Sequence, residues 1–154
     1  MTTHKTIQHG TLINIFGKGV LLLGPSAAGK SDLALRLIMP PYFSFDKSNQ
    51  AQLVADDQVE ILIETVKNQK KLYGQSPEAL KGLLEVRHLG IKTFTFLEKS
   101  PIDLAIKLKK HHEIERLPEE RAEIEIVKGY SLPLFFLDPF EASALHKLNL
   151  ILSE

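Results

Sequence analysis

Cysteine is absent from the 154 residues of this chain, which excludes disulfides, thiolate metal sites and cysteine nucleophiles. An excess of either charge is also absent, because Lys plus Arg and Asp plus Glu each number 19. A chain without net charge has no global field that would attract nucleic acid or an anionic membrane. We therefore expect neither as a partner, and any anion has to be bound by a local group of residues.

Long apolar runs are absent as well, and no stretch approaches the length needed to span a bilayer. The first ten residues, Met1 to Gly10, are polar and lack the apolar core of a signal peptide. We expect a cytoplasmic protein on these grounds. The length fits a single domain over residues 1–154 that buries its own core.

The apolar pattern predicts more strands than helices. Residues 20–23 are four apolar residues without alternation, which indicates a strand buried on both faces. Residues 31–39 consist of strong helix formers and end at Pro40 and Pro41, and residues 40–51 are expected to form an exposed loop. Other expected strands cover residues 11–16, 52–55, 59–66, 71–73, 83–87, 91–97, 102–108, 123–127 and 132–137. The fold class predicted is an unusually β-rich α/β domain.

A second helix is expected at the end of the chain. Asp138 is a candidate N-cap, with Pro139 at the first helical position and Glu141 at the third. The helix would run to about Leu152 and place one apolar face on the core. That face would consist of Phe140, Ala144, Leu148 and Ile151.

One segment matches the phosphate-loop pattern G-x-x-x-x-G-K-[ST] in full. It consists of Gly24, Pro25, Ser26, Ala27, Ala28, Gly29, Lys30 and Ser31. Its glycines allow a tight turn whose N–H groups form an anion nest, Lys30 adds a positive charge, and the Ser31 hydroxyl is placed to bind Mg²⁺. A chance match in such a chain is on the order of one in two hundred. Because the motif also lies between an apolar strand and a helix, it predicts binding of the phosphates of ATP or GTP.

Two carboxylates, Asp56 and Asp57, follow the expected strand at residues 52–55. Ligands of parallel α/β sheets bind beyond the carboxyl ends of the strands, which is also where the phosphate loop begins. Adjacent strand residues point to opposite faces, so we expect different roles for the two. One would hold Mg²⁺, directly or through water, or accept a proton from an attacking hydroxyl. The alternative is a solvated turn, which Asp also favours.

Taken together, five segments of the chain resemble the catalytic domain of the HPr kinase/phosphorylases, bacterial P-loop enzymes. They are His9-Gly10-Thr11-Leu12, GPSAAGKSDLALRLI (24–38), LVADD (53–57), LLEVRHLGI (83–91) and Glu115-Arg116-Leu117. Their order agrees with the family. The chain looks most like the short alphaproteobacterial form, which the ending at 132–144 also resembles. The resemblance implies a β-rich P-loop domain of the HPr kinase/PEP carboxykinase-like type.

The resemblance also implies an activity. The family uses ATP and Mg²⁺ to phosphorylate a serine of HPr, a carrier of the sugar phosphotransferase system. By motif position, Lys30 would hold the phosphates, Ser31 and Glu85 would bind Mg²⁺, and Asp56 would be the base. His9 and Arg116 would be further active-site residues. The family usually assembles as a homohexamer, so a homo-oligomer is implied.

Taken alone, several of these residues have ordinary alternatives. A histidine near a terminus, such as His9, is more often a plain surface residue. Arg116 lies in a charged run, which is usually a solvated face. Glu85 and Arg87 share one face of a short strand and would also make an ordinary surface ion pair.

The chain departs from the family pattern at three places. His88 replaces the signature glycine, and residues 40–51 are longer than the usual link. The stretch 136–140 lacks the arginine of the family's Pro-Gly-Arg-Asn loop, which speaks against phosphorylase activity. Two rival functions stay open, namely a small-molecule kinase and a nucleotide-sensing module without catalysis. An arginine-rich lid, common in small-molecule kinases, is not evident.

Overall fold

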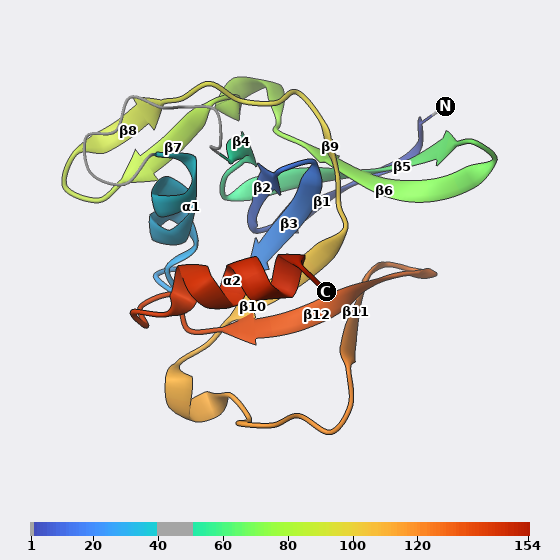
Figure 1. Cartoon of the computed structure of the whole chain (residues 1–154). Coiled ribbons are helices and arrows are strands. Elements are labelled where there is room, and N and C mark those ends of the chain that lie inside the picture. Colours follow the sequence, from blue (N-terminus) through green and yellow to red (C-terminus); the bar gives the residue numbers. More distant parts are fainter. Residues whose placement is uncertain (1, 40–50) are drawn as a thin grey trace.

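The computed structural model describes residues 2–39 and 51–154. It has three layers (Figure 1). Two helices cover one face of a six-stranded sheet, and a four-stranded sheet packs on the opposite face. A separate two-stranded hairpin lies near the first helix. The β-rich α/β fold predicted from the sequence is confirmed.

The central sheet is mixed, with two parallel and three antiparallel pairs of neighbouring strands. In spatial order its strands are β11 (Ala122–Val127), β12 (Tyr130–Leu137), β10 (Leu104–Leu108), β3 (Lys18–Leu23), β2 (Thr11–Ile15) and β4 (Gln52–Ala55). Strand β2 is antiparallel to both β3 and β4, so β3 and β4 point in the same direction. The phosphate loop after β3 and the aspartates after β4 therefore lie at the same edge of the sheet, as predicted.

The outer sheet is antiparallel throughout and consists of β1 (Thr2–His9), β5 (Gln58–Val66), β6 (Gln69–Gln75) and β9 (Ser100–Pro101). The hairpin of β5 and β6 agrees with the prediction, and its turn residues Lys67 and Asn68 have φ of 50° and 64°. Strand β1 was not predicted, because its sequence is polar and its Ile7 is exposed. Backbone pairing with β5 holds it in place.

The helices are α1 (Lys30–Ile38) and α2 (Ala144–Leu152), and two short 3-10 turns are η1 (Glu78–Leu80) and η2 (His111–Glu113). Helix α1 agrees with the prediction for residues 31–39. The expected loop at 40–51 lies outside the described residues except for Ala51, which is buried. The remaining pair of strands is the hairpin of β7 (Leu83–Val86) and β8 (Gly90–Thr93), so the strand expected at 91–97 is shorter than predicted.

The predicted start of the last helix was wrong. The carboxylate of Asp138 accepts hydrogen bonds from the backbone N–H of Phe140 and of His111, both at 2.9 Å. It therefore closes a turn and joins two loops, and α2 begins only after Ser143. Ala144 and Leu148 are buried as expected, whereas Phe140 lies outside the helix and is 67% exposed.

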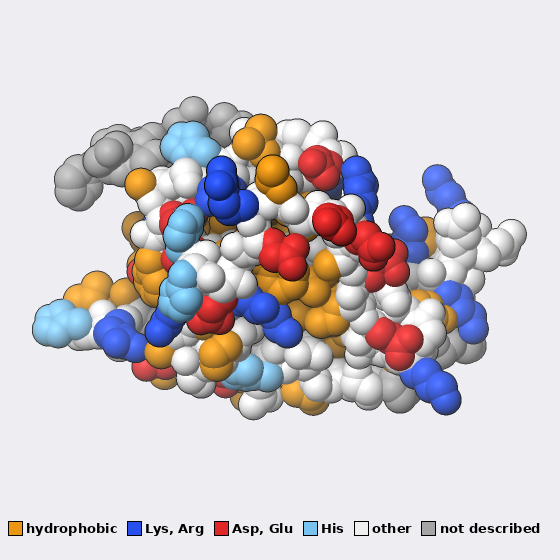
Figure 2. Space-filling view, turned by 90° about the horizontal axis from the view of Figure 1, so that it is seen from below, with side chains coloured by type: hydrophobic (Ala, Val, Ile, Leu, Met, Phe, Trp, Pro, Cys, Tyr) orange, Lys and Arg blue, Asp and Glu red, His pale blue; other side chains and the backbone are white. Residues whose placement is uncertain are grey.

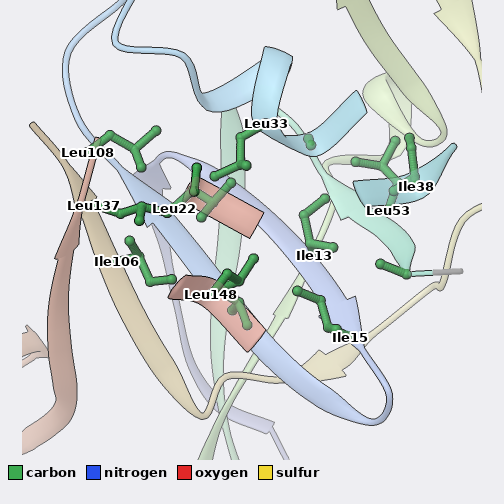
Figure 3. Close-up of a cluster of buried hydrophobic side chains, with 14 of the residues drawn as sticks. Ile13, Ile15, Leu22, Leu33, Ile38, Leu53, Ile106, Leu108, Leu137 and Leu148 are labelled. Carbon is green, nitrogen blue, oxygen red and sulfur yellow. The ribbon is translucent and has the colours of Figure 1, made fainter. Parts of the chain in front are cut away.

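The core consists of two layers separated by the six-stranded sheet. Val20 and Leu22 of β3 face the helices, whereas Leu21 and Leu23 face the outer sheet. Figure 3 shows Leu22 among residues of the helix side, including Leu33 of α1 and Leu148 of α2. Each such side chain stabilises the fold by about 1.5–3 kcal/mol through burial. Strand β3 is thus buried on both faces, as predicted, and gives the phosphate loop a rigid base.

Candidate active site

The phosphate loop joins β3 to α1 through residues with left-handed backbone conformation. Gly24, Ala27 and Gly29 have φ of 148°, 67° and 103°. The carbonyl of Gly29 accepts the first helical hydrogen bond, from Leu33 at 2.9 Å. Left-handed residues within such a turn are typical of anion nests, and the N-terminus of α1 opens on the same loop.

Lys30 is the first residue of α1 and is buried, with 7% exposure. Its ammonium donates to the carbonyls of Gly24 at 2.6 Å and Pro25 at 2.9 Å. Burial lowers the pKa of Lys30 below its ordinary value, and the charges of Asp56 and Asp57 oppose this in part. The ammonium is thus folded onto the loop, where a phosphate oxygen would be a stronger acceptor than a carbonyl.

Asp56 connects the acidic strand end to the phosphate loop. Both of its carboxylate oxygens accept from the hydroxyl of Ser31 at 3.1 Å, and one accepts from Thr11 at 2.7 Å. Asp56 therefore lies on the same side of the sheet edge as Lys30 and Ser31. This geometry agrees with a carboxylate that acts on a bound phosphate or on a hydroxyl beside it.

Asp57 has a different partner, although both aspartates lie in the turn after β4 and line the same cavity. Its carboxylate lies 3.4 Å from Nδ1 of His9, which forms an ion pair when His9 is protonated. The backbone of Asp57 is left-handed, with φ of 68°, and its carbonyl accepts from Gly10 at 3.1 Å. The turn after β4 thus brings the end of β1 to the site.

A cavity of about 590 Å³ lies between the phosphate loop, the aspartates and β7. Its volume is within the range of about 300–1,000 Å³ that is typical of small-molecule sites. Glu85 and Arg87 both line it. In the described part of the chain, these two side chains do not form an ion pair with each other. His88 lies in the turn of the β7–β8 hairpin with φ of 75°.

Most of the site residues predicted from the sequence meet in this cavity. Those that line it are His9, Ser26, Ala27, Gly29, Lys30, Ser31, Asp56 and Glu85. Gly24 and Pro25 contribute carbonyls to Lys30, and Ala28 packs against the core. Arg116 is exposed in the segment between η2 and β11 and is not among the described residues that line the cavity.

Thr11 and Phe140 are two of the residues at the site that the sequence did not predict. Thr11 is completely buried and bonds Asp56, but nothing in the sequence distinguishes it from an ordinary strand threonine. Phe140 lines the cavity, although its spacing had suggested the buried face of a helix. The signal that could have found it is an aromatic residue shortly after the strand predicted at 132–137, because ligands bind beyond the carboxyl ends of parallel strands.

The donor set suits a cation that is held partly by substrate. Within the described residues, no group of three or more His, Asp or Glu side chains is arranged to hold a metal. Mg²⁺ usually needs only one or two carboxylates, because phosphates and water complete its shell. Ser31, Asp56 and Glu85 line one cavity with the phosphate loop and fit that requirement.

The family model described as "HPr Serine kinase C-terminal domain" matches residues 1–137. The chain belongs to this family. The HPr kinase/phosphorylases of Caldicellulosiruptor bescii and Streptococcus pneumoniae are 39% and 34% identical to it over 139 residues. These matches cover 84% of the chain, which spans only about 40% of the length of these relatives.

A solved structure supports the same membership in the HPr serine kinase family. The chain is similar to the Hpr(Ser) kinase/phosphatase from Coxiella burnetii with a TM-score of 0.73 and 26% identity, over 96% of this chain and 89% of that one. The β-rich P-loop fold is therefore that of the family. No helix in the described part is both long and apolar enough to cross a bilayer.

Proposed function

We propose that the chain is an ATP-dependent protein kinase that phosphorylates a serine of HPr or of an HPr-like carrier. One observation supports this above all, namely the hydrogen bonds of 3.1 Å between Ser31 of the phosphate loop and both oxygens of Asp56. They bring a candidate base to the place where the terminal phosphate of a bound nucleotide would lie. The names of the similar proteins, which are HPr kinases, support the choice of carrier.

In this reaction the serine oxygen of the carrier attacks the terminal phosphorus of ATP. The bond from that phosphorus to the bridging oxygen breaks, and ADP leaves. Asp56 accepts the serine proton, and Lys30 neutralises charge on the phosphates. Mg²⁺, held by Ser31 and Glu85, would offset the charge of the phosphates.

Two further residues have proposed roles at the border of the site. His9 lies beside Asp57 at the cavity and would orient the incoming serine segment. Arg116 is proposed to stabilise the transferred charge, and since it does not line the cavity, this role requires its segment to approach the bound carrier. Replacing Arg116 with Ala should then lower transfer without changing the affinity for nucleotide.

The charge distribution is compatible with a protein partner. Figure 2 shows one face of the molecule, on which Lys and Arg side chains are spread out and interspersed with acidic and apolar ones. We propose a cytoplasmic protein that needs neither nucleic acid nor membrane as a partner. It would assemble as a homo-oligomer, a hexamer by analogy with its family, which analytical ultracentrifugation would measure.

The deciding experiment is incubation with Mg²⁺, labelled ATP and HPr-type carriers from the host, followed by location of the phosphate. We expect label on one carrier serine. Nucleosides and sugars serve as rival acceptors, and label on these would indicate a small-molecule kinase. Tight ATP binding without transfer to any acceptor would indicate a sensing module instead. Phosphorylated carrier incubated with inorganic phosphate would test phosphorolysis, which is not expected.

A further inference from the structure

Phe140 is a large apolar side chain that is 67% exposed and yet lies against the phosphate loop. A methyl group added to Gly29 would lie 3.0 Å from Cζ of Phe140 and 2.7 Å from Cγ of Pro139. The ring therefore touches the loop with its edge, while most of its surface faces solvent. It also lines the same cavity as Lys30 and Ser31.

The segment that carries this ring is fixed from several sides. The Asp138 carboxylate accepts from the N–H of Phe140 and of His111, each at 2.9 Å, and so joins the loops after β12 and β10. The guanidinium of Arg36 in α1 donates to the carbonyl of Pro139 at 2.5 Å. Because the ring is already held in place, a ligand that binds to it pays little conformational entropy for ordering the protein.

The topology determines which part of a nucleotide would reach Phe140. Asp56 follows β4 on one side of the strand that carries the phosphate loop, whereas Phe140 follows β12 on the other side. Figure 1 shows the segment before α2 beside the N-terminus of α1, away from β4 and β7. If the terminal phosphate lies at Asp56, the nucleoside has to extend past Gly29 toward Phe140.

We propose that Phe140 is the platform on which the base of the bound nucleotide stacks. The inference rests on the nucleotide-dependent function proposed above and names the subsite for the base. Stacking uses the face of the ring that is exposed, and every base has such a face. The platform therefore accepts adenine and guanine alike and leaves selection between them to other groups.

The test compares a ligand that has a base with one that lacks it. Affinities for Mg-ADP and for magnesium tripolyphosphate are measured by calorimetry on the wild type, Phe140→Ala and Phe140→Tyr. For Phe140→Ala we expect ADP to bind on the order of 5- to 150-fold more weakly, while tripolyphosphate binds as in the wild type. Phe140→Tyr should restore ADP binding. An equal loss for both ligands, or no loss for ADP, would overturn the proposal.

A fluorescent variant gives a second readout. The chain contains no tryptophan, so Phe140→Trp introduces a single indole at the proposed subsite. Its emission should change when ADP or GDP binds and should stay constant with tripolyphosphate. The same change with all three ligands would show that the indole senses the phosphates or the loop, and would contradict stacking.

Failure of this inference differs from failure of the proposed function. If the wild type binds neither ADP nor tripolyphosphate, the assignment of the phosphate site is wrong, and the assignment of the base subsite is wrong as well. If both bind and Phe140→Ala changes only the KM for the carrier, the ring is a docking contact for the protein substrate. That result would overturn base stacking and leave the kinase function intact.

Discussion

The hydroxyl of Ser31 donates to both carboxylate oxygens of Asp56 at 3.1 Å. This contact joins two segments that are 25 residues apart in the sequence. It links the residue expected to hold Mg²⁺ to the residue expected to take the proton. Because Asp56 is assigned to the proton and not to the phosphates, a change there should affect transfer far more than binding.

Replacing Asp56 with Asn keeps the size of the side chain and one oxygen that accepts from Ser31 and Thr11, but removes the base. We expect phosphoryl transfer to fall on the order of 10²- to 10⁴-fold, with ADP affinity largely unchanged. The matched control is Asp57→Asn, which leaves the Ser31 contact in place and should reduce transfer less. Single-turnover kinetics and calorimetry measure the two quantities, and wild-type transfer by Asp56→Asn would refute the assignment of the base.

Lys30 should make nucleotide affinity depend on pH. Burial holds the pKa of Lys30 below its ordinary value of 10.5 in the free protein, whereas bound phosphate stabilises the ammonium and raises that pKa. Between the two pKa values the complex binds more protons than the free protein, so the affinity falls as pH rises through this window. Below the lower pKa it should be constant.

The measurement is an ADP titration from neutral pH up to 10.5, the ordinary lysine pKa. The control is Lys30→Met, which has a similar length and no charge. This variant should bind more weakly at neutral pH and lack the alkaline decline. A decline of the same size in both proteins would assign it to another group.

Gly29 should tolerate no side chain, for two separate reasons. Its φ of 103° disfavours any L-residue, and a Cβ would lie 2.7 Å from Pro139. Gly90 has φ of 94° but nothing within 4 Å of a Cβ, so Gly90→Ala isolates the backbone effect. We expect Gly29→Ala to cost about 1–3 kcal/mol of stability and Gly90→Ala less. Urea unfolding compares them, and only Gly29→Ala should lose nucleotide binding.

His88 should be replaceable by the glycine found in the family signature. Its φ of 75° lies in the left-handed region, which is strained for a residue with a Cβ. We expect His88→Gly to raise the free energy of unfolding by about 1 kcal/mol. The neighbouring Leu89→Gly, at a position without positive φ, should lower it by roughly 0.5–1 kcal/mol. Equal signs for the two variants would contradict the backbone explanation.

Local signals in the sequence predicted much of this molecule. The phosphate loop, the buried strand at 20–23 and the aspartates after β4 all have short-range patterns that result from local chemistry. Their meeting at one sheet edge followed from the rule that ligands bind at the carboxyl ends of strands. That rule held although β2 lies between β3 and β4 and runs in the opposite direction.

What the sequence did not predict depends on contacts between distant residues. Strand β1 forms because its backbone pairs with β5, and its polar side chains give no period that would reveal this. The sequence pattern of a helix start is present at Asp138, Pro139 and Glu141. The Asp138 carboxylate instead accepts a hydrogen bond from the backbone N–H of His111, 27 residues away. This tertiary contact outweighed a capping preference of about 1 kcal/mol and left Phe140 exposed.

Strand β2 separates the phosphate loop strand from the aspartate strand. Neighbouring strands lie about 4.8 Å apart, so the spacing of the two halves of the site is set by β2, which is buried along its whole length. Any local unfolding that detaches β2 from its neighbours therefore separates the phosphate loop from the Asp56 carboxylate in a single event. The active centre should accordingly disassemble as one cooperative unit, and amide exchange at Leu12 and Ile13 would report its lifetime.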